Sequence, residues 1–164
     1  MEHIVQNLVD SLRNVLSNEV IVFLISMLPI VELRGGVFAA SLLRIDWHMA
    51  LPICIIGNLL PIPFILLFIK KIFEFLKNTR LVKFINKLEN KAEQKSASVL
   101  KYKKFGLFLF VAIPIPGTGA WMGALIAALL NMNIKDAFIS IALGVISAGL
   151  IMAILSYGVL GLFI

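Results

Sequence analysis

Long apolar runs separated by short polar turns dominate the chain. Apolar residues fill positions 20–43, 51–69, 105–130 and 137–160, and each run is long enough to enter a bilayer. The first and third runs are broken near their centres by proline, glycine or charged residues, whereas the other two are more nearly continuous. The pattern predicts an all-α integral membrane protein with about four membrane-embedded segments.

Two further stretches are polar on one side and apolar on the other. Residues 3–16 repeat apolar positions with a helical period, and Ser17-Asn18-Glu19 is typical of the cap of the helix that follows. The polar stretch 72–104 carries one apolar stripe on a basic helix. We expect the first helix to lie in the membrane interface or against the bundle, and the second to lie on the inner leaflet, held by anionic lipid. The predicted organisation is a single membrane domain, 1–164, made of an amphipathic helix (1–19), a first repeat (20–69), a basic connector (70–104) and a second repeat (105–164).

Composition and charge agree with a membrane location. The chain of 164 residues is 60% hydrophobic, with a mean hydropathy of +1.01, whereas soluble domains are nearer about 45–50% apolar. Of its 15 Lys and Arg residues, eleven lie between Lys70 and Lys104. The positive-inside rule explains this cluster better than nucleic-acid binding and predicts a cytoplasmic connector in a multi-pass protein of the cell membrane. The acids that precede the first long apolar run argue against a cleavable signal peptide.

An offset of 87 residues aligns the two halves of the chain. It pairs identical residues at eight positions without a gap: Phe23/Phe110, Pro29/Pro116, Gly36/Gly123, Ala40/Ala127, Leu42/Leu129, Leu43/Leu130, Ala50/Ala137 and Gly57/Gly144. If the broken segments cross the membrane fully, the repeats are parallel, whereas segments that dip in and return make them inverted. Irregular backbone at depth is tolerated inside protein or beside water, which favours re-entrant hairpins whose tips meet near the midplane.

The two tips carry the candidate binding residues. Glu32 lies deep in an apolar segment, where its carboxyl group favours the protonated form unless Arg34 or free backbone amides stabilise the charge. Glu32 is therefore a candidate for coupling proton movement to substrate passage, and Arg34 is a candidate for binding a phosphate group. Asn58 and Thr118 are expected to face the same cavity. The expected tip residues are Pro29, Gly35, Gly36, Pro114, Pro116, Gly117 and Gly119.

Each of these assignments has a structural alternative. Glu32 and Arg34 are also explained by a pair with each other, or with the other hairpin, that only fixes the fold. The glycines are also explained by tight packing, and Trp121 is either a gate or an ordinary packing aromatic. Since the sequence contains no metal cluster, nucleophile–base set or nucleotide loop, we expect no enzyme activity, no metal and no cofactor. The expected partners are membrane lipids, a small-molecule or lipid-linked substrate and protons, with a homo-oligomer left open.

The two tip motifs and the basic connector resemble the family of small multidrug export proteins. The motifs are Pro29-Ile-Val-Glu32-Leu-Arg34-Gly35-Gly36 and Ile113-Pro114-Ile-Pro116-Gly117-Thr-Gly119-Ala. That family is similar in design to the DedA / SNARE-associated (VTT-domain) superfamily, which has two opposed re-entrant hairpins and includes lipid-carrier transporters and scramblases. Pro29 and Glu32 match its first Pro-x-x-Glu tip, and Ile115-Pro116-Gly117 matches its second tip. The two arginines that flank the second tip in the superfamily are replaced here by Ile113 and Gly119.

The resemblance implies a small membrane transporter, with proton-coupled export or flipping of an amphipathic or lipid-phosphate substrate between the hairpins. One alternative is a multidrug cation exporter without a lipid role, and another is a non-transporting scaffold that acts through the connector. An Arg34 that is free in the cavity would favour anionic substrates. Glu32 without an accessible Arg34 would favour cations.

Overall fold

The computed structural model describes residues 5–7, 9, 12, 16–77, 82–115 and 117–158, and every regular element in this part of the chain is helical. The prediction of an all-α protein is therefore confirmed for the described residues. The elements are α2 (Asn18–Met27), α3 (Glu32–Leu42), α4 (Trp47–Leu59), α5 (Ile62–Lys77), α6 (Val82–Ala112), α7 (Ala120–Leu129), α8 (Ile134–Ala153) and the π-helix η1 (Ile154–Gly158).

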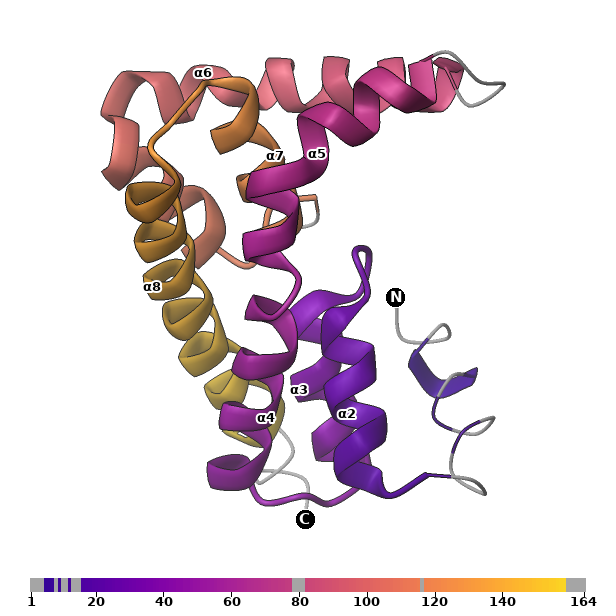
Figure 1. The fold of residues 1–164 in the computed structure, drawn as a ribbon. Helices are drawn as coiled ribbons and strands as arrows, with labels where there is room; N and C mark the ends of the chain where they lie inside the picture. The colour runs from indigo at the N-terminus through magenta and orange to yellow at the C-terminus, as the bar shows by residue number, and fades with distance from the viewer. Residues whose placement is uncertain are drawn as a thin grey trace.

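Helices α2 and α3 form an antiparallel hairpin whose turn lies about midway along the molecule (Figure 1). The Ser17 side chain caps α2 by accepting a hydrogen bond from the Val20 N–H. Pro29 lies in the turn, where its missing N–H and fixed φ suit a chain reversal. Helix α3 then begins at Glu32 with the left-handed φ of 52°.

A second hairpin enters from the other end of the molecule. The final part of α6 descends to a loop over residues 113–119, and α7 returns toward the end from which α6 came (Figure 1). Gly119 precedes α7 with a φ of 129°, a conformation that favours glycine. The turns of the two hairpins meet in the middle of the molecule.

The two hairpins end in the same type of turn, 87 residues apart. After α3, Arg44 has φ 55° and the N–H of Ile45 bonds to the Ala40 carbonyl; after α7, Asn131 has φ 52° and the N–H of Met132 bonds to the Ala127 carbonyl. This is the helix ending in which a left-handed residue lets the chain satisfy the last carbonyls. The offset found in the sequence is therefore also an offset of backbone conformation at these positions.

Two longer runs of helix are long and apolar enough to cross a bilayer: Trp47–Ile69, which includes α4 and most of α5, and Ile134–Gly158, which includes α8 and η1. Gly57 on α4 and Gly144 on α8 allow close helix packing, because a Cβ at Gly57 would lie 2.7 Å from the Phe23 carbonyl oxygen and one at Gly144 would lie 2.7 Å from Val111. Each of these helices therefore packs closely on the first arm of a hairpin.

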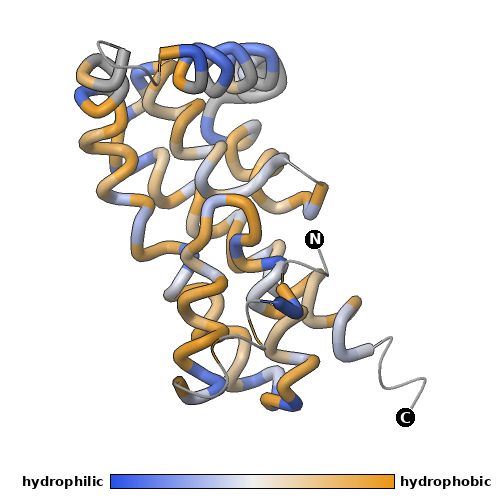
Figure 2. Tube along the Cα trace, turned by 90° about the vertical axis from the view of Figure 1, so that its right-hand side faces the viewer, coloured by the Kyte–Doolittle hydropathy of each residue, from blue (hydrophilic) through white to orange (hydrophobic). Residues whose placement is uncertain are grey.

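Hydrophobic residues cover most of the body, and hydrophilic residues gather on the arm formed by the beginning of α6 and at the opposite end (Figure 2). The predicted boundaries at 69/70 and 104/105 both fall inside helices, because α5 and α6 each continue from the body into this arm. Near the N-terminus, Val5 and Val9 are buried and Gln6 is exposed. Much of the expected helix over residues 3–16 lies outside the described residues.

Candidate functional site

Arg34 connects the first hairpin to the loop of the second. Its side chain is 9% exposed. It donates hydrogen bonds to the Ile115 carbonyl, to the Ile113 carbonyl at 3.4 Å and to the Thr118 hydroxyl oxygen at 2.8 Å. Both carbonyls also accept backbone bonds within the loop, from the Ile115 N–H to Ile113 at 2.8 Å and from the Thr118 N–H to Ile115 at 3.1 Å. The guanidinium therefore adds donors to a loop in which the prolines at positions 114 and 116 bring no N–H.

Glu32 caps the beginning of α7 from the opposite hairpin. Its side chain is 6% exposed, and its two oxygens accept hydrogen bonds from the backbone N–H groups of Ala120 at 3.2 Å and Trp121 at 3.3 Å. The first N–H groups of a helix have no partner within the helix, and their dipoles favour a negative charge. Gly119 offers no capping side chain of its own, and the Glu32 carboxylate takes that role.

Trp121 makes the corresponding contact in the other direction. Its indole N–H donates to the Met27 carbonyl, at the end of α2, over 3.2 Å. Trp121 lies 87 residues after Arg34, so these two residues occupy equivalent positions in the repeats, and each donates hydrogen bonds across to the other hairpin. Each hairpin thus extends a side-chain donor to carbonyls in the turn region of the other.

Asn58 on α4 lies beside these contacts. It is 2% exposed and lines a small cavity of about 10 Å³ together with Glu32 and Arg34. The structure therefore brings together all four residues that the sequence nominated for binding, since Thr118 is bonded to Arg34. The cavity described between the hairpins is much smaller than the expected substrate, because described residues of the two tips pack directly against each other.

The predicted tip residues occupy different places. Pro29, Pro114, Gly117 and Gly119 lie in the two turns, and Pro116 lies outside the described residues. Gly35 and Gly36 lie inside α3, where they are buried. A Cβ at Gly36 would lie 1.9 Å from the Ser26 hydroxyl oxygen, so this glycine serves close packing, which was the alternative explanation.

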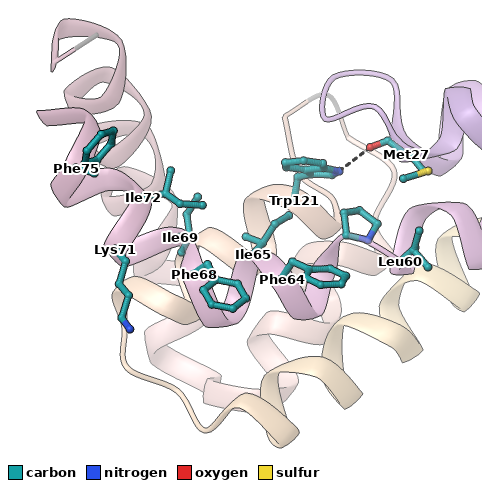
Figure 3. Close-up of a pocket in the computed structure, with 11 residues that line it drawn as sticks. Met27, Leu60, Phe64, Ile65, Phe68, Ile69, Lys71, Ile72, Phe75 and Trp121 are labelled. Atoms are coloured by element: carbon teal, nitrogen blue, oxygen red, sulfur yellow. Dashed lines mark hydrogen bonds between the residues drawn. The ribbon is translucent and has the colours of Figure 1, made fainter. Parts of the chain in front are cut away.

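A larger groove opens on the other side of Trp121. It has a volume of about 820 Å³ and runs along the apolar face of α5, with Trp121 and Met27 at one end and Lys71 and Phe75 toward the other (Figure 3). The sequence analysis did not anticipate this groove. The phenylalanines at positions 64, 68 and 75 are spaced along one face of α5 and were the available signal.

Trp121 was the main functional candidate that sequence reasoning undervalued. It closes one end of the groove with its side chain and bonds to the Glu32 carboxylate through its backbone N–H. The signal in the sequence was the offset of 87 residues, which places Trp121 at the position equivalent to Arg34. The described residues contain no group of three or more His, Cys, Asp or Glu side chains that could hold a metal ion.

Residues 32–151 match the protein family described as "Putative small multi-drug export protein". The chain belongs to this family. The match includes α3 and α7, the second arms of both hairpins, and thus the residues that meet at the centre. No curated protein and no solved structure is significantly similar to the chain. Family membership and the two long apolar helices make this a membrane protein, and the family's name indicates export. The similarity to the DedA superfamily stays a prediction.

Proposed function

We propose that the protein is a transporter, not an enzyme, that exports amphipathic organic cations in exchange for protons. Glu32 is the carboxylate that a proton and the substrate occupy in turn. The observation that carries this proposal is the contrast between Glu32 and Arg34. The hydrogen bonds described for Arg34 all go to the loop of the opposite hairpin, which favours a structural role for its guanidinium over binding of a substrate anion.

The proposed membrane arrangement has two re-entrant hairpins that enter from opposite faces, as inverted repeats. Its support is helix length: α2, α3 and α7 have 10, 11 and 10 residues. At about 1.5 Å per residue each is roughly 15 Å long, half of a hydrocarbon core of about 30 Å. The equivalent turns after α3 and α7 lie toward opposite ends of the molecule (Figure 1), which is the relation that an inverted repeat requires.

The groove beside Trp121 is the proposed site for the apolar body of the substrate. Its volume of about 820 Å³ is in the range of pockets that hold drug-sized molecules. Charge argues for the orientation of a cation in it. At one end of the groove, the Glu32 carboxylate accepts a hydrogen bond from the backbone N–H of Trp121. Lys71 lines the groove toward its other end. An aromatic indole at the negative end adds a surface on which a cation is stabilised.

Export by this scheme requires Trp121 to move. Glu32 is not among the described residues that line the groove, and in this scheme the indole N–H bond to Met27 breaks to let the substrate cation reach the carboxylate. Protonation of Glu32 from the other side would then release the cation. In this scheme the basic connector lies in the cytoplasm, where the anionic lipids of the inner leaflet attract its Lys and Arg side chains.

The experiment is uptake into proteoliposomes with an imposed proton gradient. Tetraphenylphosphonium and tetraphenylborate have nearly the same size and opposite charge. We expect gradient-driven transport of the phosphonium, a loss of at least about tenfold in Glu32→Gln, corresponding to roughly 1.4 kcal/mol or more, and little change in the exposed control Glu19→Gln.

Three results would contradict the proposal. Transport of the borate in preference to the phosphonium would support the anionic, lipid-phosphate substrate. Undiminished transport by Glu32→Gln would remove the carboxylate from the mechanism. Transport of neither ion, together with a cellular function that disappears when a neutral linker replaces residues 72–104, would support the scaffold hypothesis.

A further inference from the structure

The small cavity between the hairpin tips has the size and the chemistry of a site for one water molecule. Its volume is about 10 Å³, and about 10–15 Å³ is enough for a single water. Three polar side chains line it, those of Glu32, Arg34 and Asn58, and the remaining lining residues are Leu33, Val111, Gly119, Ala120, Val145 and Ala148.

The side-chain oxygen of Asn58 lacks a hydrogen-bond donor at this cavity. Its Oδ1 atom is buried and has no hydrogen-bond partner. A buried acceptor left without a partner destabilises the fold. The residue 87 positions later, Val145, lines the same cavity with an apolar side chain. The equivalent helix position in the second half is thus filled by an apolar residue, so packing by itself does not explain an amide at position 58.

Hydrogen-bond chemistry indicates which molecule or ion this cavity can bind. The Glu32 carboxylate and the Asn58 carbonyl oxygen are both acceptors, so they cannot bond to each other while Glu32 is ionised. A water molecule can donate one hydrogen to each of them. A hard metal ion such as Ca²⁺ or Mg²⁺ would need about six or more oxygen ligands, and the side chains that line the cavity offer the oxygens of Glu32 and Asn58 together with the positive charge of Arg34.

We propose that this cavity binds one water molecule that bridges Glu32 and Asn58, and that Asn58 is the residue that positions it. When Glu32 takes up a proton, its O–H group donates to the water oxygen, and the water continues to donate to Asn58. The charged neighbour of this unit among the lining residues is Arg34, whose described hydrogen bonds go to the Ile113 and Ile115 carbonyls and the Thr118 hydroxyl. The use of this water in proton exchange rests on the proposed function, whereas its presence does not.

The test is infrared difference spectroscopy of the full-length protein in nanodiscs, with no substrate, between high and low pH. The carboxyl C=O band of Glu32 is identified by its loss in Glu32→Gln. We expect a water O–H band that moves in H₂¹⁸O and appears together with the Glu32 band. In Asn58→Val this water band should be lost, and the C=O band should move to higher frequency because the acid has lost its acceptor.

Two comparisons make the result specific. Val145→Ala changes the apolar wall of the same cavity and should keep both bands. Asn58→Val places at position 58 the residue found at the equivalent position 145, and a melting temperature close to that of the parent would show that a spectral loss is not a loss of fold. The absence of an ¹⁸O-sensitive band in the unaltered protein, or unchanged bands in Asn58→Val, would overturn the proposal. Because no transport is measured, failure of the export proposal leaves this result unaffected.

Discussion

The carboxylate of Glu32 occupies the space in which Gly119 would carry a side chain. A Cβ on Gly119 would lie 1.9 Å from Oε2 of Glu32. The two residues are 87 positions apart, and each stands at the beginning of the second arm of its hairpin with a positive φ, 52° for Glu32 and 129° for Gly119. Two equivalent side chains cannot share this central space. A pair of similar hairpins therefore holds a single carboxylate.

Gly119→Ala should be strongly destabilising. The new methyl group would overlap the Glu32 carboxylate. In addition, the φ of 129° at position 119 is energetically costly for alanine. We expect a loss of about 2–4 kcal/mol in the free energy of unfolding, measured as a fall in melting temperature in detergent. The control is Gly158→Ala, where a Cβ meets nothing within 4 Å. Equal melting temperatures for the two variants would contradict the described contact.

Arg34→Lys should disturb the junction between the hairpins although it keeps the charge. The guanidinium uses two nitrogens to reach the Ile113 and Ile115 carbonyls and the Thr118 hydroxyl, a forked geometry that an ammonium group cannot reproduce. We expect a loss of about 1–3 kcal/mol in stability. Arg44→Lys, at an exposed turn, is the matched control and should melt with the parent. Full stability of Arg34→Lys would show that the fork is dispensable.

The groove predicts a fluorescence response to substrate. The chain has two tryptophans, so Trp47→Phe leaves Trp121 as the sole reporter. Tetraphenylphosphonium should change its emission, and Phe64→Ala, in the groove, should weaken the apparent affinity about fivefold to tenfold through loss of about 1–1.4 kcal/mol of aromatic contact. Phe105→Ala removes an exposed phenylalanine elsewhere and should leave the affinity unchanged. An equal effect of both substitutions would argue against binding in the groove.

The topology predicts labelling from opposite sides. In a Cys54→Ala background, single cysteines replace His48, near the turn after α3, and Lys135, near the equivalent turn after α7. Because these turns lie at opposite ends of the molecule, an impermeant maleimide should reach His48→Cys from outside the cell and Lys135→Cys from the cytoplasmic side. Lys87→Cys in the connector marks the cytoplasmic side. Labelling of both turns from one side would contradict the inverted arrangement.

The ion pair between Lys104 and Asp136 should contribute little. The Nζ atom of Lys104, within α6, is 2.8 Å from Oδ2 of Asp136, in the first turn of α8, but the side chains are 62% and 36% exposed. Exposed pairs are typically worth about 0–1 kcal/mol and are screened by salt. Asp136→Asn should therefore lower the melting temperature only slightly, and the difference from the parent should shrink at high salt. A large loss that persists at high salt would show that this pair fixes the helix packing.

The sequence alone determined the helical class and the four apolar segments, and it singled out Glu32, Arg34, Asn58 and Thr118 as candidates. These followed from hydrophobic period, from the cost of charges and kinks inside apolar runs, and from an offset of 87 residues that also reappears in the turn hydrogen bonds. Such signals are local or repeat along the chain, so they can be read without coordinates.

Only the tertiary structure decided which partners these residues have. Contacts between residues some 80 to 90 positions apart place Arg34 against the carbonyls of Ile113 and Ile115, and place Glu32 on the N–H groups of α7. Such pairings depend on how two hairpins face each other, and no local pattern fixes that geometry. The same packing decides the size of the cavities. The one beside Glu32, Arg34 and Asn58 has a volume of about 10 Å³, and the larger groove is lined by Trp121.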